Sequence, residues 1–175
     1  MRLGKSVIEY REVLQLIRCD ASDEFGRLVR IILHGIFSVY WALDNLSLVA
    51  SFGLINIPEF EISQSAMTIK FVGMSLATLF NLRTWVRLHY EELKARREIR
   101  RLRGEENLSK DKEMMELVLR QWKMFLMCLK IMAEMLPTIA RSALAKQLLN
   151  IKVPRVAQAL GGLVNAFVSC LIAAY

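Results

Sequence analysis

The residues that most often carry catalysis are scattered along this sequence and form no recognisable site. His34 lies in an apolar stretch and His89 in a basic one, and neither has further ligands at a metal-binding spacing. We therefore interpret His34 as a packing histidine whose ring is satisfied by a hydrogen-bond partner. Carboxylates concentrate in charged stretches and not in an apolar pocket suited to acid-base work, and there is no glycine-rich phosphate loop or nucleophile elbow. The sequence predicts a protein that is not an enzyme and that needs no cofactor or metal.

Side chains suited to a lipid surface are instead regularly spaced near the N-terminus. Residues 4–19 predict an amphipathic helix, because apolar side chains recur there at three- and four-residue steps. The predicted membrane-inserting face consists of Val7, Tyr10, Val13, Leu14 and Ile17. The predicted contacts with lipid headgroups are Lys5, Arg11 and Arg18. Such a helix can lie flat in a headgroup layer, and a bundle helix with one solvated face fits the pattern equally well.

The end of the chain carries a second distinctive pattern. Residues 156–175 contain no charged side chain, and a helix of this length covers the roughly 30 Å hydrocarbon core of a bilayer. Small and polar residues recur there at four-residue steps, a spacing that lets helices approach closely within a membrane. The predicted helix-packing residues are Ala157, Gly161, Gly162, Asn165, Ala166 and Ser169. We expect this surface to contact the apolar segments ending near Ile57 and Leu82, or a second copy of itself; the alternative is the last buried helix of a soluble bundle.

The composition favours a membrane protein without settling the question. Apolar residues make up 54% of the 175 positions, and the net charge of +7 suits a surface of anionic lipids. Nucleic acid is not an expected partner, because no zinc spacing, recognition helix or aromatic-interleaved basic strand is present. The three cysteines, Cys19, Cys128 and Cys170, are odd in number and widely spaced, which indicates reduced packing residues and no disulfide framework.

Helical periodicity without strand alternation predicts an all-α integral membrane protein, built as one membrane-associated domain over residues 1–175. We expect about five helical segments. These are the amphipathic helix at 4–19, an apolar segment at 23–57, an apolar then basic helix at 61–103, an amphipathic Met-rich helix at 110–150 and the C-terminal hydrophobic segment at 155–175.

Polar residues inside these segments indicate local features. Asp44 marks either a loop between two short helices or a polar contact in a bundle, because an unpaired charge inside a membrane is costly. Pro137 should kink or break its helix, and Lys130 is placed to pair with Glu134 one turn away. The arginine-rich arm of the third segment belongs on the cytosolic side by the positive-inside rule, with Trp85 at the level of an aromatic belt.

Four stretches along the chain resemble a known family. They are Arg2-Leu3-Gly4-Lys5, then Asp44-Asn45-Leu46 through Phe52-Gly53-Leu54-Ile55, then Leu79-Phe80-Asn81-Leu82-Arg83 leading into the charged arm, and Gly161-Gly162-Leu163-Val164 through Leu171-Ile172-Ala173-Ala174-Tyr175. In this order, and with this hydropathy profile, they resemble the peroxin-eleven family of peroxisomal membrane proteins over nearly the whole chain.

The resemblance implies an integral protein of the peroxisomal membrane that promotes peroxisome elongation, proliferation and fission. In the family an amphipathic N-terminal region inserts into the outer leaflet, and the helix from Lys5 to Arg18 falls in that region. The resemblance also implies self-association, and action with a fission adaptor and a dynamin-like GTPase that would supply the energy for scission.

A second role within the family is a membrane channel or metabolite pore. Its polar path would be lined by His34, Asp44, Asn45 and Asn165. We expect remodelling in preference to a pore, because spanning helices around a pore should show a more regular polar stripe. A third interpretation is a soluble helical adaptor that hides these apolar faces in its own core.

Overall fold

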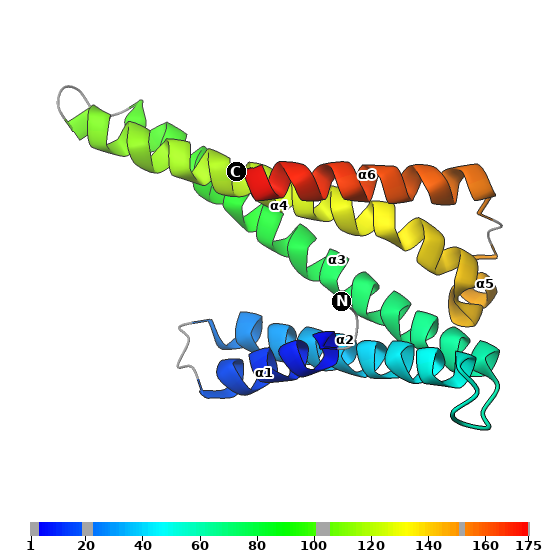
Figure 1. Ribbon diagram of the computed structural model, residues 1–175. Coiled ribbons are helices and arrows are strands. Elements are labelled where there is room, and N and C mark those ends of the chain that lie inside the picture. Colours follow the sequence, from blue (N-terminus) through cyan, green and yellow to red (C-terminus); the bar gives the residue numbers. More distant parts are fainter. Residues whose placement is uncertain (1–3, 19–22, 101–105, 151–152, 175) are drawn as a thin grey trace.

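The computed structural model describes residues 4–18, 23–100, 106–150 and 153–174, and in these residues it contains six helices and no strand. The helices are α1 (Lys5–Arg18), α2 (Glu24–Ser51), α3 (Glu59–Ile99), α4 (Glu106–Arg141), α5 (Ala143–Leu149) and α6 (Arg155–Ala174) (Figure 1). The predicted all-α class is confirmed. Cys19 and the expected segment ends at residues 19, 103 and 175 lie outside the described residues.

Side-chain caps explain two of the helix ends. The Asp23 carboxylate accepts a hydrogen bond of 3.0 Å from the Gly26 N–H and so begins α2. Ser142 does the same for α5, because its hydroxyl oxygen accepts from the Ala145 N–H at 3.2 Å. α4 runs through Pro137 and ends at Arg141, so a helix break at the proline was wrong. The long helix expected over 110–150 is divided at Ser142 instead.

The helices pack in series and do not enclose a common core. α1 packs on α2, α2 on α3, α3 on α4 and α4 on α6, while the short α5 contacts α3 and α4. Figure 1 shows the α1–α2 hairpin on one side of the long, diagonal α3, with α4 and α6 side by side on the other. Within the described part of the chain, α1 therefore contacts α2 alone and α6 contacts α4 alone.

This open arrangement leaves a large apolar surface. The accessible surface is 12466 Å², against about 8,700 Å² expected for a compact soluble monomer of this mass. Among the described residues, exposed large apolar side chains far outnumber buried ones, and they line α2, α3 and α6. These three helices are also long and apolar enough to cross a membrane, judged by length and composition.

Candidate membrane surface

α1 is docked through polar contacts. The Glu9 carboxylate lies 2.6 Å from His34 Nδ1, and the Ser38 hydroxyl donates to the Ser6 carbonyl oxygen at 3.1 Å. The Lys5 ammonium sits 4.4 Å above the centre of the Trp41 ring. His34 thus has a side-chain partner, as expected of a packing histidine. Because α2 occupies this polar side, the opposite side of α1 is turned outward.

The outward side of α1 carries four of the five residues predicted to insert into a membrane. Their side chains are between 37% and 68% exposed and are those of Val7, Tyr10, Leu14 and Ile17. The fifth, Val13, is half-buried. The predicted headgroup contacts Arg11, Arg18 and Lys5 are exposed. Ile8, which the helical pattern did not assign to the face, is exposed as well.

An outward apolar face on a surface helix is the reverse of the arrangement in a soluble bundle, where that face is buried against the core. α1 contributes no buried residue to the fold. Removing such side chains from water gains roughly 25 cal/mol per Å² of apolar surface, so exposure of this face to water is unfavourable.

α6 contacts α4 through part of its small-residue ladder. Gly161 is buried, and Ala157, Asn165 and Ser169 are half-buried along the same side. Gly162 and Ala166 lie on the exposed side. Val168, fully buried beside the ladder, was not among the predicted packing residues, because its size gives no signal of close approach.

Gly161 allows the closest approach in this contact. A Cβ atom built on Gly161 would lie 2.5 Å from the backbone oxygen of Ala133. That carbonyl lacks its usual helical donor, because the residue four positions later is Pro137, which has no N–H. Because glycine has no Cβ, α6 can lie against the freed carbonyl at this point. The expected partners near Ile57 and Leu82 were therefore wrong within the chain, since the residue that fits Gly161 is on α4.

A half-buried ion pair joins α3 to α4. Lys70 Nζ lies 2.6 Å from the Glu134 carboxylate. The expected pairing of Glu134 with Lys130 is not the one observed, because Glu134 points across to α3. The only sequence signal was Lys70 itself, a single charge in an apolar run, and nothing local identified a partner 64 positions away.

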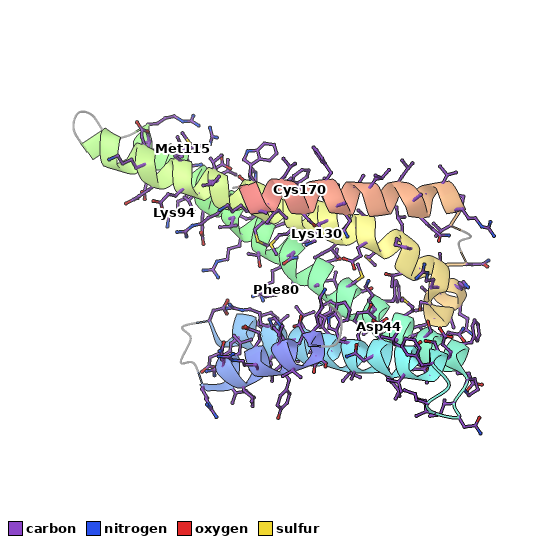
Figure 2. All side chains as sticks on the ribbon, in the orientation of Figure 1. Asp44, Phe80, Lys94, Met115, Lys130 and Cys170 are labelled. Carbon is purple, nitrogen blue, oxygen red and sulfur yellow. The ribbon has the colours of Figure 1, made fainter. Side chains whose placement is uncertain are left out.

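The Lys70–Glu134 pair borders a polar cavity of about 480 Å³. Charged groups from four helices line it, including Lys5, Asp44, Glu59 and Arg141. Asp44 lies within the continuous α2 helix (Figure 2), so a loop at this position was wrong, and the residue borders the polar cavity instead. Of the four residues expected to line a pore, only Asp44 reaches this cavity; His34 pairs with Glu9, and Asn45 and Asn165 are elsewhere.

These surfaces do not by themselves identify a protein family, but comparison of the sequence with known families does. The family model of peroxisomal biogenesis factor 11 (PEX11) matches residues 1–173. The chain belongs to the PEX11 family. No curated protein and no solved structure matched it.

Membership gives this PEX11 chain a role in peroxisome biogenesis and an association with peroxisomes, and the family is not known for enzymes. The family stretches coincide with structural contacts. Gly4 and Lys5 open α1, Asp44 borders the polar cavity, and Gly161 forms the α4–α6 contact. The stretch from Leu79 to Arg83 marks where α3 changes from apolar to basic.

The cysteines of this PEX11 protein form no disulfide in the described part of the chain. Cys128 on α4 is half-buried, and Cys170 on α6 (Figure 2) is exposed; both are free thiols. Burial raises the pKa of the Cys128 thiol, which favours the protonated and less reactive form.

Proposed function

We propose that this PEX11-family protein remodels the peroxisomal membrane and thereby promotes elongation, proliferation and fission of the organelle. The observation that carries the proposal is the orientation of α1, whose polar side contacts α2 while its apolar side faces outward. α2, α3 and α6 would anchor the protein in the bilayer, since each has the required length and apolar character. Self-association, a fission adaptor and a dynamin-like GTPase would complete the process.

The physical route to curvature is a change in leaflet area. A helix inserted about 5 to 10 Å into one leaflet enlarges that leaflet relative to the other, which bends the bilayer. When α2 crosses the bilayer, α1 cannot lie along α2 and in the membrane plane at once. Insertion therefore requires α1 to swing away. The Glu9–His34 and Ser38–Ser6 contacts that join it to α2 are partly exposed, so each contributes little to stability, which favours separation.

The test uses the full chain in cells that lack their own members of the family. Replacing both Tyr10 and Leu14 with Asp should abolish peroxisome elongation, because two carboxylates on the inserting face oppose transfer into the leaflet. Peroxisome length and number are measured by microscopy. The matched control is Gln15→Asp, an exposed position beside the face, which should elongate peroxisomes normally. Full elongation by the double variant would contradict the proposal.

Integral insertion has a separate test. After alkaline carbonate treatment of isolated membranes, we expect the chain to stay in the membrane pellet, because three spanning helices are not removed by high pH and salt. The proportion in each fraction is read by immunoblot, with a luminal protein as the released control. Release into the supernatant would rule out anchoring by α2, α3 and α6.

A channel or metabolite pore is the second candidate, and the polar cavity bordered by Asp44 and Lys70 is the feature that favours it. Planar-bilayer recording on purified protein decides the matter. Reproducible conductance that falls on Asp44→Ala substitution would support the pore, and its absence across preparations would exclude it.

A further inference from the structure

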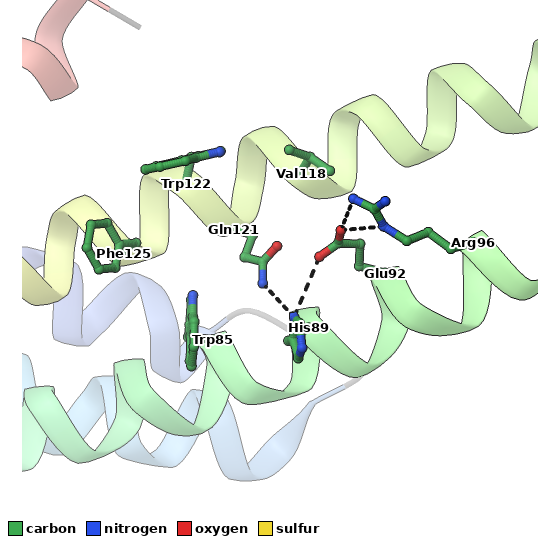
Figure 3. Close-up of a pocket in the computed structure, with 8 residues that line it drawn as sticks. All are labelled: Trp85, His89, Glu92, Arg96, Val118, Gln121, Trp122 and Phe125. Carbon is green, nitrogen blue, oxygen red and sulfur yellow. Dashed lines mark hydrogen bonds and ion pairs between the residues drawn. The ribbon is translucent and has the colours of Figure 1, made fainter.

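A pocket of about 400 Å³ opens between α3 and α4, beyond the apolar half of α3 (Figure 3). Its volume falls within the range of about 300–1,000 Å³ typical of small-ligand sites. Trp85, His89, Glu92 and Arg96 line it from α3, and Val118, Gln121, Trp122 and Phe125 from α4. It shares no residue with the surface of α1.

One end of the pocket is aromatic. Trp85 stacks on His89 with ring centres 6.0 Å apart, and Trp122 meets Phe125 edge to face at 5.8 Å. Trp122 is 59% exposed, so packing within the protein does not account for this large side chain. Aromatic faces carry negative charge density and attract cations, most strongly in the case of tryptophan.

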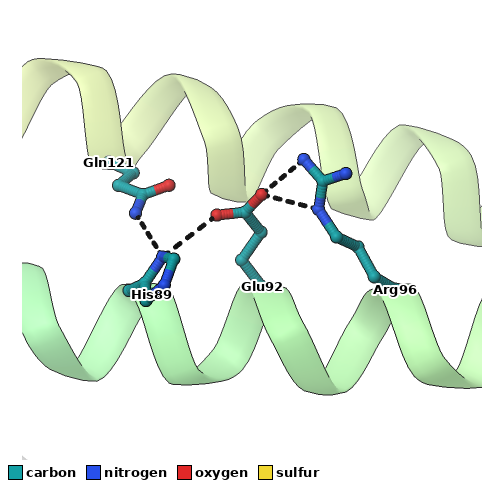
Figure 4. A network of polar contacts seen from close by, with 4 residues as sticks. All are labelled: His89, Glu92, Arg96 and Gln121. Carbon is teal, nitrogen blue, oxygen red and sulfur yellow. Dashed lines mark hydrogen bonds and ion pairs between the residues drawn. The ribbon is translucent and has the colours of Figure 1, made fainter.

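The other end holds the buried Glu92 carboxylate, whose two oxygens face different partners (Figure 4). Arg96 donates through Nε at 2.7 Å and lies at 2.6 Å through Nη2, and both contacts go to Glu92 Oε1. Glu92 Oε2 is 3.6 Å from His89 Nδ1, which is beyond a hydrogen bond. The Gln121 amide nitrogen lies 3.0 Å from the same Nδ1, and since an amide nitrogen only donates, Nδ1 is the acceptor there. The close contact of His89 Nδ1 is thus with Gln121, and Glu92 Oε2 lies beyond hydrogen-bond distance of it.

We propose that this pocket binds the choline headgroup of a phospholipid. The quaternary ammonium would sit among Trp85, Trp122 and Phe125, attracted by Glu92 Oε2, and the phosphate would lie by the partly exposed Arg96 guanidinium. A primary ammonium fits less well. It brings three N–H donors, for which the pocket offers two oxygen acceptors, Glu92 Oε2 and the Gln121 side-chain carbonyl, its remaining lining being the rings, Val118 and the cationic Arg96.

The surroundings favour a lipid over a free choline ester. Leu82 lies about one helical turn from Trp85, toward the apolar half of α3, and is half exposed. Met132 lies two turns from Phe125 on α4, in the same direction along the pair, and is exposed too. Acyl chains can follow this apolar surface from the pocket into the hydrocarbon region.

The test is a titration of the full chain in a maltoside detergent, which has no choline. Trp41 is first replaced by Phe, so that the remaining tryptophans, Trp85 and Trp122, are both in the pocket. Dihexanoyl phosphatidylcholine should change their fluorescence saturably. Dihexanoyl phosphatidylethanolamine and free phosphocholine should each bind at least about tenfold more weakly. Equal affinity for the ethanolamine lipid would overturn the headgroup assignment, and equal affinity for free phosphocholine would overturn the lipid assignment.

Substitutions locate the binding in this pocket. Trp122→Ala should weaken binding about tenfold, and Trp122→Phe, which keeps a ring, by no more than about threefold. Glu92→Gln should also weaken it about tenfold, while its neighbour Glu91→Gln, which pairs with Arg87 outside the pocket, should have no effect. Unchanged affinity in Trp122→Ala would overturn the proposal. Trp122 is exposed, so this variant decides the question even if Glu92→Gln does not fold. Because none of these residues belongs to α1, failure here is distinguishable from failure of the remodelling proposal.

Discussion

Replacing Gly161 with Val should detach α6 from α4 and lower the free energy of unfolding by about 3 kcal/mol, the upper end of the usual cost of overpacking. The added Cβ would meet the Ala133 carbonyl oxygen at 2.5 Å and two Leu136 carbons at 3.1 and 3.3 Å. The first of these is backbone and cannot turn aside as a flexible side chain can. The separation would also uncover the carbonyl that Pro137 leaves without a donor, which is expensive in an apolar surrounding.

The matched control for this prediction is the next residue. A Cβ on Gly162 meets no atom within 4 Å, so Gly162→Val should change stability by less than about 1 kcal/mol. Both variants are measured by denaturant titration of purified protein in detergent, followed by circular dichroism. Equal losses in the two variants would show that a valine in α6 is harmful in itself and that the α4–α6 contact is not tight at Gly161.

The sequence predicts the helices well because their signals are local. Residues 4–19 give α1 almost to the residue, since an amphipathic period and its flanking charges lie within one stretch. Five large apolar side chains of α1 are exposed, and the same period identifies all of them except Ile8. It does not show that Ile8 is exposed and Val13 half-buried, because the position of α2 decides which part of the arc is covered.

Contacts between helices were less predictable, because each depends on a partner far away in the chain. The glycine at 161 indicated a close approach without indicating to what, and its partner is the carbonyl freed by a proline on another helix. Pro137 was expected to kink or break its helix, and it does not break it, since α4 continues for four residues beyond the proline. The interface position expected for Trp85 stays a prediction, and the pocket that Trp85 forms with Trp122 could not be foreseen, because it requires α3 and α4 to lie side by side.

The ion pair between Lys70 and Glu134 is another contact between distant residues, and it contributes to the free energy of unfolding. Replacing Lys70 with Met should lower the free energy of unfolding by about 2 kcal/mol, because the Glu134 carboxylate loses its partner. We place this below the 3–5 kcal/mol of fully buried pairs because the Glu134 side chain is 34% exposed, although Lys70 is only 15% exposed. The measurement is the denaturant titration used for the glycine variants.

The double variant Lys70→Met/Glu134→Met separates the loss of the pair from the burial of a single charge. It should regain stability to within about 1 kcal/mol of the natural chain, because two apolar side chains of similar length incur no cost of desolvating a charge. Arg87→Met, which breaks the exposed pair with Glu91 on the same helix, should cost less than about 1 kcal/mol. If the double variant were as unstable as the single variant, the prediction would be contradicted. The two charges, together with the polar cavity that they border, would then stabilise the packing of α3 against α4.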